Sequence, residues 1–491
     1  MLTDTCLAVL DDADETLTAV LARALAAVLR AGDVVLLEGP VGAGKTHFAR
    51  ALIRARQGDA AEDVPSPTFT LVQTYEDSTG TEIWHADLYR LSDPSELIEL
   101  GLDEALATAI TLIEWPERMG LTPAQALTVT LAPTAPDRRR IMLTGDPDRW
   151  GDIPRISRMA QFLHGAGWGA ARVSPLAGDA SARRYFRVIE GAADPTEPQH
   201  PAHRTAVLMD DPSAMVAPYV AMTDWLRTRG LHAPELFALD PAAGFLLMED
   251  LGDDLVARVL LDSPEMAGVI YDRITDLIAD LHSHAPPDFV PALNADLLAE
   301  QVGLFPDWYP AAAGAAGKGA DVAAAIKALH RALCEDVPPV VSLRDFHAEN
   351  IVWRGDAPLG LLDFQDAVAV HPGYELASAL QDARRDIAPE TEARCIARYL
   401  DATGLDPDRF SAAYALLGAQ RGLRIMGIFT RLCLRDGKPR YLDFMPRVWA
   451  AVARDVAHPA LAPLATALEG IPAPSDKIID RIRTRCGTVT A

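Results

Sequence analysis

Several residue types are scarce in this sequence, and each scarcity argues against a class of protein. The 491 residues include only five cysteines, which are scattered and form no Cys-x-x-Cys pair. This pattern argues against zinc sites and a disulfide framework, and it fits reduced thiols in a cytoplasmic protein. No stretch of 18 apolar residues occurs, and no basic segment followed by an apolar one stands at the N-terminus. We therefore expect no membrane span and no secretory leader.

Lysine is scarce as well, and acidic residues greatly outnumber basic ones. Asp and Glu total 69 against 45 Lys and Arg, which gives a formal net charge of −24. Such a surface repels the phosphate backbone of nucleic acids. We therefore expect any nucleic-acid role to be indirect, through a partner protein. The five lysines are Lys45, Lys318, Lys327, Lys438 and Lys477.

A chain of this length is too long for one ordinary hydrophobic core and predicts two or three domains. The segment 145–154 is rich in Gly, Pro and Asp and marks the expected boundary. The expected division is a first domain over 1–148, a linker over 149–155, a second domain over 156–475 with lobes at about 156–250 and 251–475, and a C-terminal tail over 476–491.

The first 145 residues alternate between apolar runs and helical patterns, which predicts an α/β domain. Each expected strand is a short apolar or alternating segment bounded by turn residues. The expected helices are 16–30, about 45–56, near 95–99 and 103–109, and the expected strands are 34–38, 68–75, 81–86, 111–115, 127–131 and 139–143.

A glycine-rich loop follows the apolar strand 34–38 directly and opens the next helix. It reads Gly39-Pro40-Val41-Gly42-Ala43-Gly44-Lys45-Thr46 and matches the P-loop pattern of ATP-binding proteins. Small residues let backbone N–H groups wrap the phosphates, and the helix dipole favours the anion. Lys45 adds a positive charge, and the Thr46 hydroxyl ligates Mg²⁺. The expected phosphate-binding glycines are Gly39, Gly42 and Gly44.

A P-loop enzyme also needs a carboxylate for Mg²⁺ or for the attacking water, usually at the end of a strand. Two residues qualify by position. Asp87 lies in His85-Ala86-Asp87-Leu88-Tyr89-Arg90, and Glu114 ends the apolar strand in Ile113-Glu114-Trp115-Pro116-Glu117. For either residue alone, an ordinary surface acid is an equally good interpretation.

These motifs, in this order, together with Val64-Pro65-Ser66-Pro67-Thr68-Phe69-Thr70-Leu71-Val72, closely resemble the TsaE family of P-loop ATPases. The resemblance covers about residues 10–145. It implies ATP hydrolysis in support of a TsaB–TsaD complex that forms threonylcarbamoyladenosine in tRNA. It also implies that Ser66 and Thr68 lie in a switch-like loop sensing the γ-phosphate. Asp87 and Glu114 then act near Mg²⁺, with Thr46 and Glu114 as metal ligands.

A second phosphate-chemistry signature lies about 300 residues further along. Asp345 and Asn350 stand five residues apart in Arg344-Asp345-Phe346-His347-Ala348-Glu349-Asn350, and Asp363 follows 13 residues later. In kinase-like folds the loop Asp accepts the proton of the substrate hydroxyl, while the Asn and the second Asp hold Mg²⁺. The apolar segments 351–353 and 359–362 flank a turn and predict the β-hairpin that delivers Asp363.

The spacing Asp-x-His-x-x-Asn resembles that of the aminoglycoside phosphotransferase superfamily, which implies a bilobal α+β fold of the protein-kinase type. Within it, residues 156–470 resemble the AmgK-like sugar kinases. That resemblance implies ATP-dependent phosphorylation of the anomeric hydroxyl of N-acetylmuramic acid or N-acetylglucosamine. The supporting motifs are the run 178–188, Leu208-Met209-Asp210, Glu249-Asp250-Leu251-Gly252, the loop 344–350, Asp363-Phe364-Gln365-Asp366-Ala367, and Gln420-Arg421 with Gly427-Ile428-Phe429.

One position departs from the general kinase pattern. The phosphate-binding lysine should end the third strand of the first lobe, where Met209 stands. Arg183, Arg184 or Arg187 could supply the charge instead, because guanidinium groups bind phosphate well. Glu249 is expected at the hinge, where nucleotide binds. Two alternatives remain: a pseudokinase that regulates the ATPase, and a kinase for another hydroxyl substrate such as an aminoglycoside or a choline-like alcohol.

Overall fold

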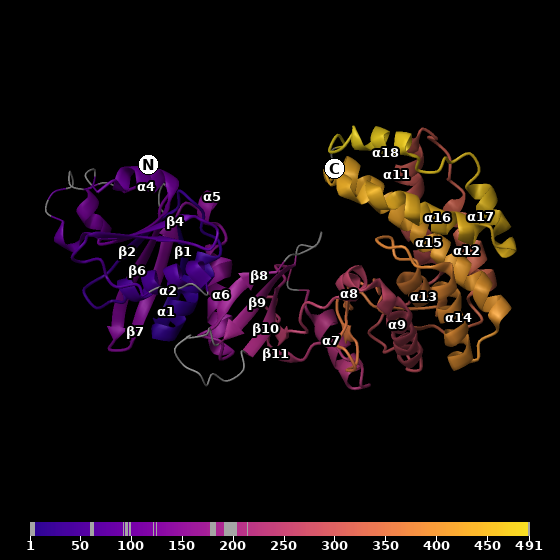
Figure 1. The fold of residues 1–491 in the computed structure, drawn as a ribbon, viewed down its shortest axis with the longest axis horizontal. Coiled ribbons are helices and arrows are strands. Elements are labelled where there is room, and N and C mark those ends of the chain that lie inside the picture. The colour runs from indigo at the N-terminus through magenta and orange to yellow at the C-terminus, as the bar shows by residue number, and fades with distance from the viewer. Residues whose placement is uncertain are drawn as a thin grey trace. The chain divides into compact units, whose positions relative to one another are not determined.

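The computed structural model describes residues 5–489 with short gaps (Figure 1). Contacts between residues divide the chain into two compact units. The first comprises Met1–Ala217 and Glu235–Asp250, and the second comprises Pro218–Pro234 and Leu251–Ala491. The gaps are 59–62, 92, 94–96, 98–99, 121, 124, 177–182, 191–203 and 214.

The first unit contains a seven-stranded mixed sheet in the order β1-β7-β6-β2-β5-β4-β3. Strand β2 pairs in parallel with β5 and β6, and β4 pairs in parallel with β5. Every residue of β5 is buried, as expected of a central strand with both faces covered. The strands are β1 (Thr5–Ala13), β2 (Val34–Glu38), β3 (Val72–Glu76), β4 (Glu82–Asp87), β5 (Ile110–Glu114), β6 (Leu127–Ala135) and β7 (Arg138–Gly145).

Most of this α/β architecture agrees with the sequence prediction, and the differences lie at element ends. The helices are α1 (Glu15–Ala26), α2 (Lys45–Gln57) and α4 (Leu102–Thr108). Helix α1 ends four residues before the expected position 30. Strand β3 begins at Val72 rather than 68, because a turn closed by the Leu71 N–H and the Pro67 carbonyl (2.7 Å) precedes it. The helix expected near 95–99 lies mostly outside the described residues.

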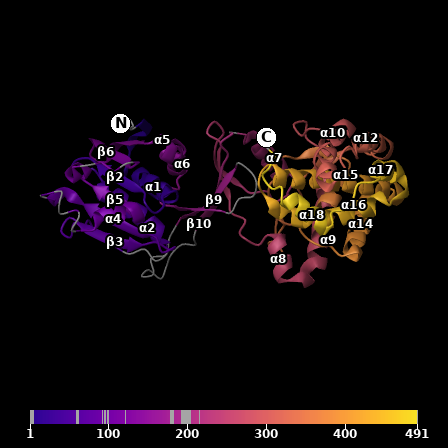
Figure 2. The same ribbon diagram turned by 90° about the horizontal axis from the view of Figure 1, so that it is seen from above.

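Helices α5 (Pro147–Trp150) and α6 (Ile153–Gly165) occupy the segment in which a linker was expected at 149–155. Trp150 is 1% exposed, and the apolar side of α6 packs against α1 (Figure 2). The Arg23 guanidinium also donates to the carbonyl oxygens of Gly169 and Ala171. One hydrophobic core therefore continues from the seven-stranded sheet into the following sheet. The domain boundaries themselves stay a prediction.

A five-stranded antiparallel sheet completes the first unit, in the order β11-β12-β10-β9-β8. Strands β9 and β10 are consecutive in the chain and pair with each other in antiparallel register. The first part of the run 178–188, residues 178–182, lies outside the described residues. The strands are β8 (Arg172–Pro175), β9 (Arg184–Glu190), β10 (Arg204–Asp210), β11 (Leu236–Asp240) and β12 (Phe245–Glu249).

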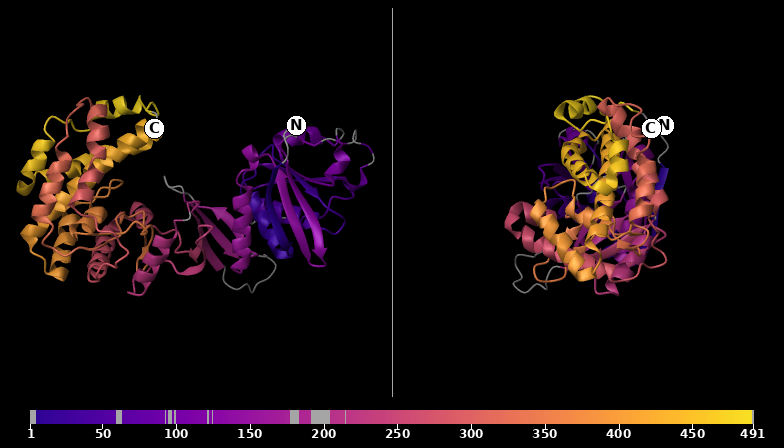
Figure 3. Two further views of the ribbon diagram at one scale, coloured as in Figure 1. Left: turned by 180° about the vertical axis from the view of Figure 1, so that it is seen from behind. Right: turned by 90° about the vertical axis from the view of Figure 1, so that its right-hand side faces the viewer.

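The second unit is mainly helical, and its colours run from magenta through orange to yellow in Figure 3. Its core surrounds the 28-residue helix α15 (Pro407–Leu434), most of which is buried. Helix α18 (Asp476–Arg483), which begins the expected tail, packs three isoleucines into this core. The other helices are α7 (Ala217–Arg227), α8 (Val256–Asp262), α9 (Ala267–His282), α10 (Ala295–Val302), α11 (Leu304–Ala313), α12 (Val322–Leu333), α13 (Gly373–Leu380), α14 (Pro389–Thr403), α16 (Met445–Val456) and α17 (Ala462–Ala467).

Two short antiparallel strand pairs frame the second signature. Strand β13 (Val340–Ser342) pairs with β16 (Val368–Val370), and β14 (Ile351–Val352) pairs with β15 (Gly360–Leu361). The β14–β15 pair is the hairpin that the sequence predicts between Asn350 and Asp363. Among the described helices, none has both the length and the apolar character needed to cross a membrane.

Candidate active sites

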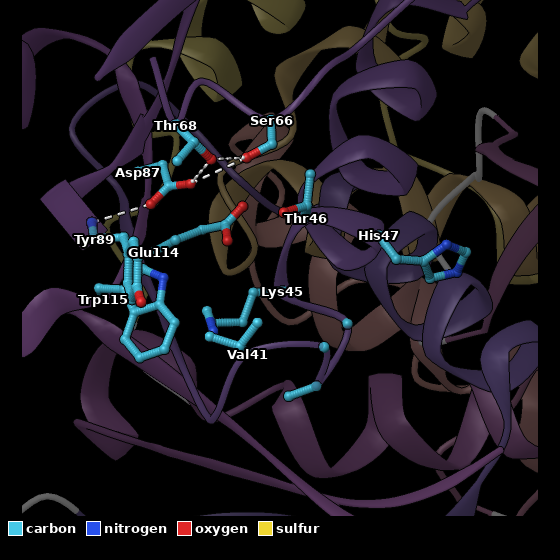
Figure 4. A pocket seen from close by; sticks show the side chains of 13 residues that line it. Val41, Lys45, Thr46, His47, Ser66, Thr68, Asp87, Tyr89, Glu114 and Trp115 are labelled. Carbon is cyan, nitrogen blue, oxygen red and sulfur yellow. Dashed lines mark hydrogen bonds between the residues drawn. The ribbon is translucent and has the colours of Figure 1, made fainter. Parts of the chain in front are cut away.

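The P-loop connects β2 to α2 and forms one wall of a cavity of about 310 Å³ (Figure 4). Gly39, Gly42 and Gly44 all have positive φ, at 138°, 79° and 104°, which glycine adopts without steric cost. A Cβ atom on Gly39 would also collide with the carbonyl oxygen of Leu131. The cavity is lined by Val41, Gly42, Ala43, Gly44, Lys45, Thr46, His47, Ser66, Thr68, Asp87, Tyr89, Glu114 and Trp115.

Lys45 places a cation in this cavity. Its Nζ donates to the carbonyl oxygens of Gly39 (2.7 Å) and Pro40 (3.0 Å) and lies 3.6 Å from the centre of the Trp115 ring. Burial lowers the pKa of Lys45, while the negative charges of Glu114, Asp87 and Glu117 oppose that shift. The ammonium group is thus held among acceptors and faces two carboxylates.

The two candidate carboxylates lie side by side, because β4 and β5 are parallel and Asp87 pairs in register with Glu114. Oδ2 of Asp87 accepts hydrogen bonds from Thr68 Oγ1 (2.6 Å) and Ser66 Oγ (3.0 Å) (Figure 4). The loop expected to act as a switch therefore contacts the acid at the end of β4. The structure brings Lys45, Thr46, Ser66, Thr68, Asp87 and Glu114 together, although they come from four separate sequence motifs.

His85 is a polar group of this site to which the sequence analysis gave no role. Its Nε2 lies 3.0 Å from Glu114 Oε1, and both side chains are buried. The period of strand β4 could have indicated that His85 belongs to the site, because His85 and Asp87 are two residues apart and so lie on the same face of the strand. Trp115 has φ 60°, and its ring lies 5.0 Å from that of Tyr89.

The second unit brings together the three residues of the second signature. Asn350 Nδ2 donates to the backbone oxygen of Asp345 (2.8 Å) and approaches Asp363 Oδ2 (3.4 Å). The Leu362 N–H donates to the Asn350 carbonyl (2.9 Å), which ties the hairpin to the loop. Gln365 Nε2 donates to the other oxygen of Asp363 (2.8 Å). Asn350 is therefore the link between the loop aspartate and the hairpin aspartate.

A buried polar network holds the backbone next to Asp345. Arg344 and Asp363 have φ of 73° and 57°, a conformation that is strained for residues with a side chain. The Arg344 carbonyl accepts a hydrogen bond from Ser378 Oγ (2.9 Å), and Arg421 donates to the same hydroxyl (2.7 Å). Glu375, which is fully buried, accepts from the Leu343 N–H (2.9 Å). Burial raises the pKa of Glu375 to about 7.

The residues proposed to replace the kinase lysine have carboxylate partners in the first unit. Met209 is 1% exposed on β10. Arg183 Nε lies 3.2 Å from Asp211, and Arg184 donates to Asp210 at 2.7 and 3.0 Å. Arg187 pairs with Asp250 (2.8 Å), and Glu249 accepts from the Glu235 N–H (3.2 Å). A phosphate-binding role for these arginines stays a prediction, and a phosphate would have to compete with these aspartates.

Other side chains near the second signature have structural partners. His347 Nε2 lies 3.2 Å from Arg384 Nη1, and burial lowers the pKa of His347, which favours the neutral ring. Asp382 pairs with Arg385 (2.9 Å). Tyr309 is a fully buried core residue of α11.

Comparison with known families matches the two parts of the chain separately. Residues 12–141 match the family model of the threonylcarbamoyl adenosine biosynthesis protein TsaE, and residues 172–413 match that of the phosphotransferase enzyme family. The TsaE protein of Rickettsia bellii is 44% identical over 126 residues, which cover 26% of this chain and 86% of that protein.

Two curated kinases resemble the remainder. The N-acetylmuramate/N-acetylglucosamine kinase of Caulobacter vibrioides is 40% identical over 344 residues, covering 63% of this chain and 94% of that protein. The enzyme of the same name from Pseudomonas aeruginosa is 32% identical over 336 residues, covering 64% of this chain and 94% of that protein. The chain therefore belongs to two families at once, with a TsaE ATPase domain joined to a phosphotransferase of the N-acetylmuramate/N-acetylglucosamine kinase family.

Proposed function

We propose that this chain performs two separate ATP-dependent reactions. The first supports threonylcarbamoyladenosine formation in tRNA, and the second transfers the γ-phosphoryl group of ATP to the anomeric hydroxyl of N-acetylmuramate or N-acetylglucosamine. The observation that best supports the first reaction is one cavity lined by Lys45, Thr46, Asp87 and Glu114. For the second, it is the connection that Asn350 makes between Asp345 and Asp363.

Both donor sets fit Mg²⁺, which prefers oxygen ligands and needs only one or two carboxylates beside phosphate oxygens. The first set offers the Thr46 hydroxyl and the Glu114 carboxylate, and the second offers the Asn350 amide oxygen and the Asp363 carboxylate. Within the described residues, no group of three or more His, Cys, Asp or Glu side chains is arranged to hold a metal ion. When bound, Mg²⁺ would neutralise phosphate charge at each site.

At the first site, the residues divide the work of ATP hydrolysis. Backbone N–H groups of the P-loop and Lys45 bind and orient the phosphates. Ser66 and Thr68 report the state of the γ-phosphate through their contact with Asp87, because a loop that can exchange one acceptor for another acts as a switch. Glu114 and Asp87 orient the attacking water and accept its proton.

At the second site, Asp345 accepts the proton of the anomeric hydroxyl as that oxygen attacks the γ-phosphorus. Asn350 keeps the loop and the hairpin at a fixed separation, so that the metal ligands and the proton acceptor stay in register. Arg183, Arg184 and the backbone near Glu249 are proposed to contact the nucleotide.

The partner of the first domain is proposed to be a TsaB–TsaD-type complex, which would hold the tRNA. The charge of −24 supports this indirect contact, because the chain offers an acidic rather than a basic surface. A cytoplasmic location stays a prediction. The test is to add the full chain to TsaB, TsaD, ATP and the remaining substrates and to measure modified tRNA. Formation that does not depend on this chain would contradict the proposal.

The kinase function is tested with the full chain, ATP and a panel of acceptors: N-acetylmuramic acid, N-acetylglucosamine, kanamycin and choline. We expect both amino sugars to be phosphorylated at the anomeric oxygen, as read by phosphorus NMR of the product, and kanamycin and choline to be left unchanged. The Asp345→Asn variant is the background control. Turnover of kanamycin or choline alone would favour the other-substrate alternative, and turnover of none would favour the pseudokinase alternative.

A further inference from the structure

Three arginines of the second unit lie close to the proton-accepting Asp345. Arg344 precedes it in the loop, and Arg421 and Arg424 stand three residues apart on α15, which places them on the same side of that helix. Arg421 is 8% exposed, and its Nη2 donates to Ser378 Oγ (2.7 Å) and approaches the Arg344 carbonyl (3.4 Å). These three residues are called the arginine cluster.

The arginine cluster contains more guanidinium groups than there are carboxylates facing it. Among the described residues, no ion pair involves any of the three, and the buried Nε atoms of Arg344 and Arg421 have no hydrogen-bond partner. By contrast, two other arginines of the second unit form ion pairs, Arg385 with Asp382 (2.9 Å) and Arg454 with Glu392 (2.7 Å).

The acidic residues that face the arginine cluster do not neutralise all of its positive charge. Asp345 is near Arg424, but it is the proton acceptor of the proposed reaction. Glu375 is near Arg421, and burial raises the pKa of Glu375 to about 7, so this group is partly protonated near neutral pH. Burial, together with the charges of Arg344 and Arg421, lowers the pKa of Arg424. In a chain with 69 acidic and 45 basic side chains, such an excess of guanidinium groups favours an anionic ligand at this place.

We propose that Arg424, together with Arg344, forms a subsite for the carboxylate of an acidic sugar beside Asp345. This inference rests on the sugar-kinase function proposed above and specifies how that site selects its substrate. The sugar must lie beside Asp345 to lose its hydroxyl proton, which brings its other substituents near the cluster. N-acetylmuramate carries a lactyl carboxylate and N-acetylglucosamine does not, so the subsite favours the former. Arg421, which is bonded to Ser378 and to the loop backbone, positions the loop.

The test measures kcat and KM of the full chain for both sugars and for ATP. With Arg424→Gln, we expect the KM for N-acetylmuramate to rise about tenfold to a hundredfold, the usual range for losing a charge-assisted hydrogen bond. The KM for N-acetylglucosamine and for ATP should change less than about twofold, within ordinary surface-mutation effects. Arg424→Lys should recover part of the loss. Arg409→Gln, at an exposed position of the same helix, is the matched control.

A second measurement does not depend on how the variants fold. On the wild-type chain, the carboxamide of N-acetylmuramic acid should show the same rise in KM as Arg424→Gln shows with the acid itself. Equal rises for both sugars, or no rise with the carboxamide, would overturn the subsite. A rise confined to the KM for ATP would assign the cluster to nucleotide phosphate instead. If the wild-type chain phosphorylates neither sugar, the kinase function itself fails, which is a distinguishable outcome.

Discussion

The P-loop site and the Asp345 site hold unusual backbone conformations in different ways. At the P-loop the left-handed residues are Gly39, Gly42 and Gly44, which adopt positive φ without steric cost. At the second site they are Arg344 and Asp363, for which the conformation costs about 1–3 kcal/mol each. That cost is offset by the bonds around the Arg344 carbonyl and the Leu343 N–H. The P-loop thus adopts its left-handed conformations because its glycines have no side chain. The Asp345 loop is instead held in its conformation by buried polar side chains.

The largest effects should come from removing the reacting or phosphate-binding groups. Such a change at one site should leave the reaction at the other site unaffected. Asp345→Asn removes the proton acceptor and should lower kcat for sugar phosphorylation about 10²- to 10⁴-fold. ATP hydrolysis stimulated by TsaB–TsaD should be unchanged. Steady-state kinetics of both reactions on the same preparation give the measurement. Loss of both reactions in a folded variant would show that the two sites are not independent.

The converse change is at the P-loop. Lys45→Ala removes the cation that faces Asp87 and Glu114 and should lower stimulated ATP hydrolysis about 10²- to 10³-fold, as expected for a lost charge-stabilising donor. Phosphorylation of N-acetylglucosamine should stay within about twofold of the wild type, within surface-mutation effects. Equal loss at both sites would instead mean that nucleotide bound at the P-loop is needed by the kinase.

A pair of glycine substitutions tests whether the P-loop requires residues without a side chain. Gly42→Ala adds a Cβ in open space, so it measures the strain at φ 79° alone, about 1–2 kcal/mol. Gly39→Ala adds the collision with the Leu131 carbonyl and should raise the KM for ATP further, by about tenfold to a hundredfold in total. ATP hydrolysis is measured in an Asp345→Asn background, so that sugar kinase turnover does not contribute. Similar values for both variants would contradict the steric argument.

Substitution of Glu375 should have the smallest effect on activity. It should, however, clearly change how the stability of the protein depends on pH. Because burial raises the folded-state pKa of Glu375 to about 7, its stabilising contribution is complete below pH about 4.5 and is lost as the pH rises towards 7. The wild type should lose about 3 kcal/mol of stability over that range through this group. Denaturant midpoints at pH 5 and pH 7.5 provide the measurement.

The variant Glu375→Gln has no charge to titrate, so its stability should fall less over the same pH range. Asp455, whose pKa burial also raises to about 7, is present in both proteins and cancels in the comparison. Equal pH dependence in the two proteins would show that Glu375 does not titrate in this range. Sugar kinase activity at pH 7 should fall by less than about threefold, because the amide oxygen still accepts from the Leu343 N–H.

Much of the first site could be predicted because its information is local. The strand 34–38, the glycines and the helix that begins at Lys45 are contiguous in the sequence, and the structure confirms all three elements. Strand β1 was not predicted, because this edge strand shows little alternation of apolar and polar residues. Family resemblance assigned Ser66 and Thr68 to a switch-like loop, but their contact with Asp87 was not predicted, because it joins a turn to a strand end about twenty residues away.

The second site shows the limit more clearly. Its reacting residues, Asp345, Asn350 and Asp363, could be identified from spacing and from the hairpin between them. The hydrogen bonds of Ser378 and Arg421 to that loop could not be predicted from the sequence, and neither could the arginine cluster. Both depend on α13 and α15, whose residues lie 30 to 80 positions further along the chain.

By itself, the sequence determined that this chain joins two phosphate-chemistry sites of different types, because each carries its reacting groups within a short, ordered motif. Only the tertiary structure decided three further features. It placed His85 against Glu114, it paired Arg183 and Arg184 with aspartates, and it gathered three arginines beside Asp345. The physical reason is that charge compensation and burial depend on which distant segments pack together, and residue spacing along the chain does not record that.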